Sequence, residues 1–356
     1  MSQSREPEAS RCPELDPIDI IALTMMDDVG PATARDHLAT IRSTSQPIDT
    51  GLDPAAFRNA RTAARRVHAS ALRLGAECAI HGEEGYPESL YALQNPPVVL
   101  WTLGDMSVLR DQPVVSIVGT RSCTLYGERV TRELSAAFAR AGVTVLSGLA
   151  LGIDAMAHRA TLEAGGVTAA VLGTGVDVPY PAKHRTLHRQ ILHRGVIVSE
   201  VPPGTAAGPG CFPRRNRIIA ALGAATIVVE APIKSGALIT ANEALTIGRT
   251  LAIVPGPIDS PQSMGSNQYM RDGGHPITCV ADALALVGCS QPRPAATRLD
   301  TADERAVWMA LENPAPNFDI LSARASLPAR LCLETVTALE LRGLVECSLT
   351  GEIRRR

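Results

Sequence analysis

The chain has 356 residues, 45% of them hydrophobic and 20% charged, which is ordinary for a globular protein and enough for two or three domains. Its 34 basic and 36 acidic residues exclude a polycation of the histone type but leave room for a local basic groove. Eight cysteines are scattered with no C-x-x-C pair and no Cys–His zinc spacing, so we expect no metal site, and a reducing compartment suits them. The polar N-terminus lacks a signal-peptide core and no apolar run approaches about 18 residues, which predicts a cytoplasmic protein without a membrane span.

The N-terminal part of the chain is predicted to be helical. Residues 1–15 are polar and are expected to form a disordered tail, and residues 16–78 are expected to form a small helical domain of the SAM or helix-hairpin-helix type. Gly30-Pro31 separates two helical stretches there and could present backbone N–H groups to a phosphate. The acidic neighbours Asp27 and Asp28 favour the alternative, a plain helical turn.

Strand-like and helix-like runs alternate over the central region, residues 79–290, after a lead-in at residues 79–105 that is punctuated by proline and glycine. Helices are expected at 126–142 and 153–166. Six apolar runs predict buried strands, at 114–119, 143–148, 167–173, 195–200, 225–231 and 250–256. This alternation predicts an α/β fold: an extended Rossmann-like, doubly wound, mainly parallel sheet, with ligand sites at the carboxyl ends of its strands.

A third domain is predicted at the C-terminus. Residues 291–300 have the composition of a linker. Residues 301–356 contain three helical stretches followed by two short extended runs about Thr350-Gly351, a pattern typical of a winged helix.

The turn after the first predicted core strand is a candidate anion site. Gly119 and Thr120 allow close approach to backbone N–H groups, and Arg121 supplies a guanidinium that matches phosphate geometry. The alternative is a tight turn with an exposed arginine. No G-x-G-x-x-G motif occurs here, which argues against NAD or FAD, and we expect no cofactor.

A second glycine-rich turn contains Ser147, Gly148 and Gly152 and leads into Asp154 and His158. The last two are four residues apart on one helix face and could serve as acid, base or metal ligands. No third ligand stands at a suitable spacing, so a structural role is favoured. We expect the aspartate to cap the helix and the histidine to form a hydrogen bond in the wall of the site.

The segment "EAPIKSGALITANE" supplies polar groups at a third strand end, namely Lys234, Ser235 and Thr240. Glu230 or Glu243 could act as a general base, or Glu230 could hold nearby arginines in position. The familiar serine-elbow, Walker A and H-E-x-x-H patterns are missing, so no catalytic residue is predicted.

The stretch "CFPRRNRIIAALG" places three arginines in the first turn of a predicted helix, where the helix dipole disfavours cations. Phe212 beside Arg214, Arg215 and Arg217 is a combination suited to single-stranded nucleic acid, in which bases stack on aromatics and phosphates meet cations. Arg214 and Arg217 share one edge of the helix and are the better candidates for phosphate, whereas Arg215 points elsewhere. Asn216 is expected to support the site. The alternative is a hydrophobic staple with solvated arginines.

Five segments together resemble the DNA-processing protein A family (DprA, also called Smf), and the match covers roughly residues 80–290. They are "GTRSCTLYG", "SGLALGIDAMAH", "FPRRNRIIAAL", "VVEAPIKSGALITANEA" and "VPGP" followed by "GSNQYMRDGGH". The resemblance implies a factor that binds single-stranded DNA, forms a homodimer through its core and hands the strand to the recombinase RecA during natural transformation, displacing single-strand-binding protein. Gly119, Thr120 and Arg121 would form its phosphate pocket, and Ser235 and Thr240 would line it. The basic, stacking edge of the pocket would be formed by Phe212, Arg214, Arg215 and Arg217. The acidic segment "MMDDVGPATA" departs from a DNA-contacting hairpin.

Two other functions stay open at this point. The related lysine-decarboxylase-like phosphoribohydrolases resemble this family in fold and carry P-G-G-x-G-T-x-x-E, but "KSGALITANE" lacks the paired glycines, so Glu243 has no partner pattern. An interaction scaffold that uses the winged helix and its closing arginines, residues 354–356, is the third alternative.

Overall fold

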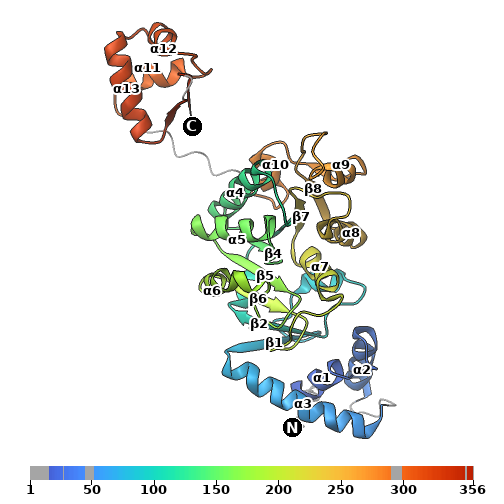
Figure 1. The fold of residues 1–356 in the computed structure, drawn as a ribbon. Coiled ribbons are helices and arrows are strands. Elements are labelled where there is room, and N and C mark those ends of the chain that lie inside the picture. The colour runs from blue at the N-terminus through green and yellow to red at the C-terminus, as the bar shows by residue number, and fades with distance from the viewer. Residues whose placement is uncertain (1–15, 27, 45–51, 290–298, 349–350, 356) are drawn as a thin grey trace, which may run out of the picture. The chain divides into compact units, whose positions relative to one another are not determined.

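The computed structural model describes residues 16–26, 28–44, 52–289, 299–348 and 351–355 (Figure 1). Contacts between residues divide the chain into two compact units, Met1–Gln291 and Pro292–Arg356. The predicted tail, residues 1–15, lies outside the described residues, as does most of the predicted linker, residues 291–298.

Three helices precede the sheet: α1 (Pro17–Thr24), α2 (Pro31–Thr44) and α3 (Pro54–Arg73). Asp16 caps α1 and Asp53 caps α3, because each carboxylate accepts hydrogen bonds from backbone N–H groups of the first turn. A proline follows each cap, at a position where no helical N–H partner is needed. Ile20 and Ile21 of α1 are buried in the same hydrophobic cluster as Trp101 of the sheet, so these helices share a core with the strands.

Nine strands form one sheet in the order β1-β2-β6-β5-β4-β3-β7-β8-β9. The strands are β1 (Ala76–Ile80), β2 (Val99–Gly104), β3 (Val114–Val118), β4 (Thr144–Ser147), β5 (Thr168–Leu172), β6 (Val196–Ser199), β7 (Ala225–Val228), β8 (Thr250–Ile253) and β9 (His275–Pro276). β2 is antiparallel to β1 and β6, and the pairs from β6 to β9 are parallel. Every residue of β3, β5 and β6 is buried, as expected for parallel strands covered by helices on both faces.

Helices cover both faces of this sheet, with α4, α5 and α6 on one side and α7 and α8 on the other (Figure 1). Their bounds are α4 (Leu125–Arg140), α5 (Ile153–Glu163), α6 (Arg185–Leu192), α7 (Cys211–Leu222), α8 (Gly236–Thr246), α9 (Met264–Arg271) and α10 (Val280–Ala285). The chain proceeds outward from β3 to β6 and then returns to β7, on the other side of β3. The order of strands therefore reverses at β3 and β7, and a crevice at their carboxyl ends is the expected ligand site of such a sheet.

The predicted fold class, an extended Rossmann-like, mainly parallel sheet, is confirmed, and all six predicted core strands are present. The sequence analysis did not indicate the strands β1, β2 and β9 or the helices α6, α8, α9 and α10. Prolines 96 and 97 directly before β2 concealed that strand, and α6 is a short, highly charged helix in which Leu187 and Ile191 are the buried aliphatic positions. β1 crosses the boundary predicted at residue 78 between the helical domain and the core.

The C-terminal unit has the predicted winged-helix elements. They are α11 (Ala302–Ala310), α12 (Phe318–Ala325), α13 (Ala329–Leu341) and a hairpin of β10 (Val345–Cys347) and β11 (Ile353–Arg355). Val307, Leu321 and Val336 lie in its hydrophobic core. Thr350 of the predicted turn is outside the described residues, whereas Gly351 adopts a φ of 86°, which glycine accommodates. None of the helices in the described ranges is long and apolar enough to cross a membrane.

Candidate functional site: a cationic cavity at the switch point

A cavity of about 440 Å³ opens at the carboxyl ends of β3 and β7. Four segments form its wall: the turn after β3, the start of α5, the first turns of α7, and the loop that leads into α8. The residues that line the cavity and have polar, charged or aromatic side chains are Thr120, Arg121, Asp154, Phe212, Arg215, Asn216, Lys234, Ser235 and Thr240. Segments that the sequence analysis singled out separately thus meet at one site.

The lining residues give this cavity a positive charge. Arg121, Arg215 and Lys234 are cationic, and Asp154 is the one carboxylate among the residues that line it. Arg121 and Lys234 are exposed, and neither forms an ion pair with any residue in the described part of the chain. These two side chains are therefore available to an anion from solvent.

The turn after β3 is held in place by its backbone. Thr120 donates its N–H to the carbonyl of Glu230 at 2.7 Å, which links the ends of β3 and β7. A Cβ on Gly119 would lie 2.5 Å from the Ile153 side chain, so a side chain at this position would collide with α5. The geometry fixes the turn while leaving the Arg121 side chain exposed.

An aromatic pair borders the cavity. The ring of Phe212, at the start of α7, lies 4.9 Å from that of Tyr180, with 34° between the ring planes. The Arg121 guanidinium lies 5.8 Å from the centre of the Phe212 ring, within cation–π range. Tyr180 is 44% exposed and was not identified from the sequence. The signal that could have identified it is rarity, because aromatic residues make up 3% of the chain and this one lies in the loop after β5.

Arg215 is a buried structural cation. Its guanidinium donates to the carbonyl of Gly148 at 2.7 Å and to that of Val171, and its Nε donates to the Asn216 side chain at 3.3 Å. Burial lowers the pKa of Arg215 to about 10, and the charge of Asp154 opposes that shift. A Cβ on Gly148 would lie 2.5 Å from the guanidinium, so glycine is needed where this arginine enters. Arg215 is one of the residues that line the cavity, but its guanidinium forms its hydrogen bonds with protein groups.

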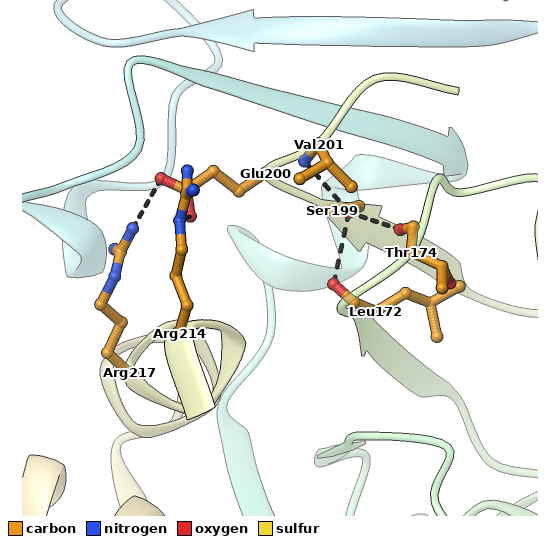
Figure 2. Close-up of polar contacts among 7 residues, drawn as sticks. All are labelled: Leu172, Thr174, Ser199, Glu200, Val201, Arg214 and Arg217. Carbon is orange, nitrogen blue, oxygen red and sulfur yellow. Dashed lines mark hydrogen bonds and ion pairs between the residues drawn. The ribbon is translucent and has the colours of Figure 1, made fainter. Parts of the chain in front are cut away.

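Arg214 and Arg217 do not line this cavity; both bind Glu200, at the end of β6 (Figure 2). The Glu200 carboxylate accepts from Arg214 Nε at 2.9 Å and from Arg217 at 2.6 Å. The glutamate and Arg217 side chains are 10% and 15% exposed, and Arg214 is 51% exposed. The adjoining Ser199 hydroxyl donates to the carbonyl of Thr174 at 2.7 Å and fixes the strand end that carries the glutamate (Figure 2).

The three arginines of α7 thus have partners outside their own helix, which offsets the unfavourable dipole at its first turn. Arg215 binds strand-end carbonyls, and the other two share one carboxylate. The sequence analysis expected Arg214 and Arg217 to be the better phosphate ligands. In this structure, however, the cations open to the cavity are Arg121 and Lys234.

The turn between β4 and α5 is organised by Asp154. Its carboxylate accepts from the N–H groups of Gly148 at 3.2 Å and Ala150 at 3.4 Å. The expectation that it caps the helix is wrong, because the N-cap is Gly152, which has a φ of 72° and no side chain to contribute. Burial raises the pKa of Asp154, and the nearby charge of Arg215 opposes that rise.

Two polar residues expected at this turn lie behind the cavity wall. The buried Ser147 hydroxyl donates to the carbonyl of Ile117 at 2.6 Å. Thr168 donates its one hydroxyl hydrogen to the carbonyl of Val145, so at 2.7 Å it accepts from Nδ1 of His158. Burial lowers the pKa of His158 to about 3, which makes it a neutral structural residue, as the sequence analysis favoured.

Glu230 does not hold the arginines, as one alternative had proposed. Its carboxylate accepts from both the backbone N–H and the hydroxyl of Thr124, the N-cap residue of α4. A Cβ on Gly127 would lie 2.3 Å from this carboxylate, so the first turn of α4 closes over it. The residue ties β7 to α4 and is only 1% exposed, which leaves it out of reach of a substrate.

The start of α8 completes the wall opposite Arg121. The Ser235 side chain caps the helix by accepting from the N–H of Ala237 at 3.3 Å. Asn216 donates to the carbonyl of Gly236 at 3.2 Å and so fastens α7 to the same turn, a supporting role like the one predicted for it. Thr240 lines the cavity from one turn further along, and Lys234 stands exposed just before the cap.

Comparison with known proteins places this chain in a family. The family model described as "DNA recombination-mediator protein A" matches residues 77–288, and one described as "DprA winged helix domain" matches residues 291–348. Protein Smf of Escherichia coli is 34% identical over 284 residues, which cover 77% of this chain and 76% of that protein.

Two solved structures are similar in fold. The X-ray structure of DNA processing protein A from Streptococcus pneumoniae matches with a TM-score of 0.69 and 30% identity, over 76% of this chain and 98% of that one. DNA processing protein A from Helicobacter pylori, described for its single-stranded DNA binding mode, matches with a TM-score of 0.53 and 29% identity, over 58% and 93%. The predicted resemblance is confirmed: the chain belongs to the DNA recombination-mediator protein A family.

Proposed function

We propose that the cavity between β3 and β7 binds single-stranded DNA and that the protein is a recombination mediator, which protects incoming strands and loads RecA on them during natural transformation. One observation carries this proposal: Arg121 and Lys234, which form no ion pair in the described part of the chain, line the cavity together with Phe212, whose ring packs on that of Tyr180. Cations for the backbone and aromatic rings for base stacking are the two elements of single-strand recognition.

The geometry favours a single strand over a duplex. A cavity of about 440 Å³ can enclose one group of nucleotide size. Bases of a single strand can be splayed out and stacked on aromatic rings, whereas those of a duplex are paired and stacked on each other. The similarity to the Helicobacter pylori protein, which is described for its single-stranded DNA binding mode, supports single-strand binding here.

Binding rather than catalysis is proposed because, among the described residues, no carboxylate is placed for acid–base chemistry at the cavity. Asp154 is buried and engaged with two backbone N–H groups, Glu230 is engaged with Thr124, and Glu243 is not among the lining residues. The phosphoribohydrolase alternative would need a glutamate facing the ligand. Homodimerisation through the core, displacement of single-strand-binding protein and a cytoplasmic location belong to the same proposal and rest on family resemblance.

The binding proposal is tested with fluorescent oligothymidylate and a hairpin duplex, for the wild type and for Phe212→Leu. Losing the stacking ring should weaken single-strand binding by about 1–3 kcal/mol without changing its dependence on salt, because no charge is removed. Tyr91→Leu is the matched control, since Tyr91 is 47% exposed and does not line the cavity. Equal affinity for both DNA forms in the wild type, unaffected by Phe212→Leu, would contradict the proposal.

RecA loading is tested separately, by following the DNA-dependent ATPase of RecA on strands covered by single-strand-binding protein. The wild type should shorten the lag before ATP hydrolysis, and Arg121→Ala should lengthen it again because the strand is no longer held. Arg129→Ala is the control, because Arg129 is exposed on the same turn-and-helix segment but does not line the cavity. An unchanged lag with saturating wild-type protein would refute the loading role and leave DNA binding intact.

A further inference from the structure

A second cationic surface lies on α6, outside the cavity. Between Pro181 and Gly195 the chain contains four arginine and lysine residues and no acidic residue, although the net charge of the whole chain is −2. The side chains that are exposed on this segment and on the adjacent face of α5 form what we call the α6 strip: Arg159, Lys183, Arg185, Arg189, His193 and Arg194.

The strip is built on a rigid, amphipathic element. Leu187 and Ile191 anchor α6 in the core, and His188 binds the carbonyl of Val176 at 2.8 Å. Arg185, Arg189 and His193 are spaced four residues apart, so they lie on one face with about 6 Å of helix axis between neighbours. That interval is close to the spacing of phosphates along an extended single strand.

Most of these cations are not neutralised by ion pairs within the part of the chain that the structure describes. Arg159, Lys183, Arg185 and Arg189 form no ion pair with a residue in the described ranges. A hollow between α5 and α6 is lined by Arg159, His193 and Arg194, and its single lining acid, Glu163, is bound by Arg132 at 3.0 Å. Asp177, which precedes the strip, accepts from the N–H of Gly204. A surface this basic and this free of acids fits a polyanion.

Along the α6 segment, the strip begins at Lys183, three residues after Tyr180. Tyr180, which packs on Phe212 at the cavity, is followed at once by the segment that carries Lys183 and α6. A strand that stacked one base on this aromatic pair and continued toward α6 would have its next nucleotides beside the N-terminal end of that helix. The cavity and the strip are therefore joined through Tyr180.

We infer that the α6 strip binds the phosphodiester backbone of the same DNA strand beyond the cavity, so that the binding site extends from Arg121 past Tyr180 and along α6. This inference rests on the proposed function of the cavity. The cavity holds one nucleotide of the strand, and the strip adds contacts to the phosphates of the nucleotides that follow it.

The test compares oligothymidylates of about 2 nucleotides, too short to span both the cavity and the strip, and of about 12 nucleotides, for the wild type and for Arg185→Gln/Arg189→Gln. Loss of two phosphate contacts should reduce the slope of log K against log salt concentration for the long strand by about 1.4. It should weaken binding of that strand about 25-fold at ~0.1 M salt. Binding of the short strand should not change. The matched control is Arg66→Gln/Arg140→Gln, which removes two exposed arginines from α3 and α4.

Two outcomes separate this inference from the proposed function. If the α6 variant binds the long strand like the wild type while Arg121→Ala weakens both lengths, the strip is refuted and the cavity stands. If Arg121→Ala changes neither length, the cavity assignment itself fails. A strand with 4-thiothymidine at each end provides a direct readout, because one end of the long strand should crosslink to the peptide between Pro181 and Arg194, and a long strand that never does so overturns the inference.

Discussion

Replacing Arg215 by methionine tests whether this arginine supports the fold or contacts DNA. Its guanidinium donates to the buried carbonyls of Gly148 and Val171 and lies close enough to Asp154 for their charges to interact. Methionine keeps most of the side-chain length but offers no hydrogen and no charge. The variant should therefore be less stable than the wild type.

The magnitude follows from these contacts. Each buried carbonyl left without its donor costs about 1–3 kcal/mol, and the buried Asp154 loses a cation that opposes the rise of its pKa. The total is about 3 kcal/mol or more. For a domain of this size that lowers the melting temperature by about 6–12 °C.

Differential scanning calorimetry of the core transition measures this loss. Arg214→Met is the control, because that side chain is half-exposed and its ion pair is worth about 1 kcal/mol or less. If Arg215 were instead solvated and bound DNA, its replacement would lower the affinity for DNA and leave the melting temperature unchanged. If Arg215→Met melts like the wild type but loses affinity for oligothymidylate, the reasoning about this arginine is refuted.

Three further predictions concern residues that support the site. Glu200→Ala should destabilise the protein by about 3 kcal/mol in urea unfolding, more than Arg214→Ala, because it leaves the largely buried Arg217 guanidinium without its carboxylate. Gly127→Ala should cost about 1–3 kcal/mol in the same assay, since the new methyl group would collide with the Glu230 carboxylate; a neutral result would mean that α4 shifts freely. His158, whose pKa burial lowers to about 3, takes up a proton in the unfolded chain at a higher pH than in the folded one. Stability should thus fall as pH drops from about 6.5 toward 3, by up to ~1.4 kcal/mol per pH unit from this group, and His158→Gln should show a shallower fall between about pH 7 and pH 5.

The sequence predicted where the site would form because its signals are local. Gly119, Gly148 and Gly152 mark the turns at strand ends, and in a parallel sheet the carboxyl ends of neighbouring strands meet at one edge. Phe212 stood out because aromatic residues are rare in this chain. These features depend on residue type and on order along the chain, which a single sequence displays.

Partners of the charged side chains could not be predicted, because they depend on three-dimensional packing. Glu200 precedes Arg214 by 14 residues and belongs to no recognisable motif. It nevertheless binds Arg214 and Arg217, the two arginines that helix periodicity had predicted to face a ligand. Arg215 reaches carbonyls 67 and 44 residues away along the chain. Helix periodicity tells which side of α7 a residue occupies, and it says nothing of what packs against that side.

The central claim, that the cavity between β3 and β7 is a phosphate site for single-stranded DNA, is tested most directly by the salt dependence of binding. Oligothymidylate is titrated at several salt concentrations with the wild type, Arg121→Ala, Lys234→Ala and the control Arg129→Ala. Each cavity variant should reduce the slope of log K against log salt by about 0.7, one phosphate contact on a single strand, and the control should not. Slopes identical to that of the wild type in both cavity variants would contradict the claim.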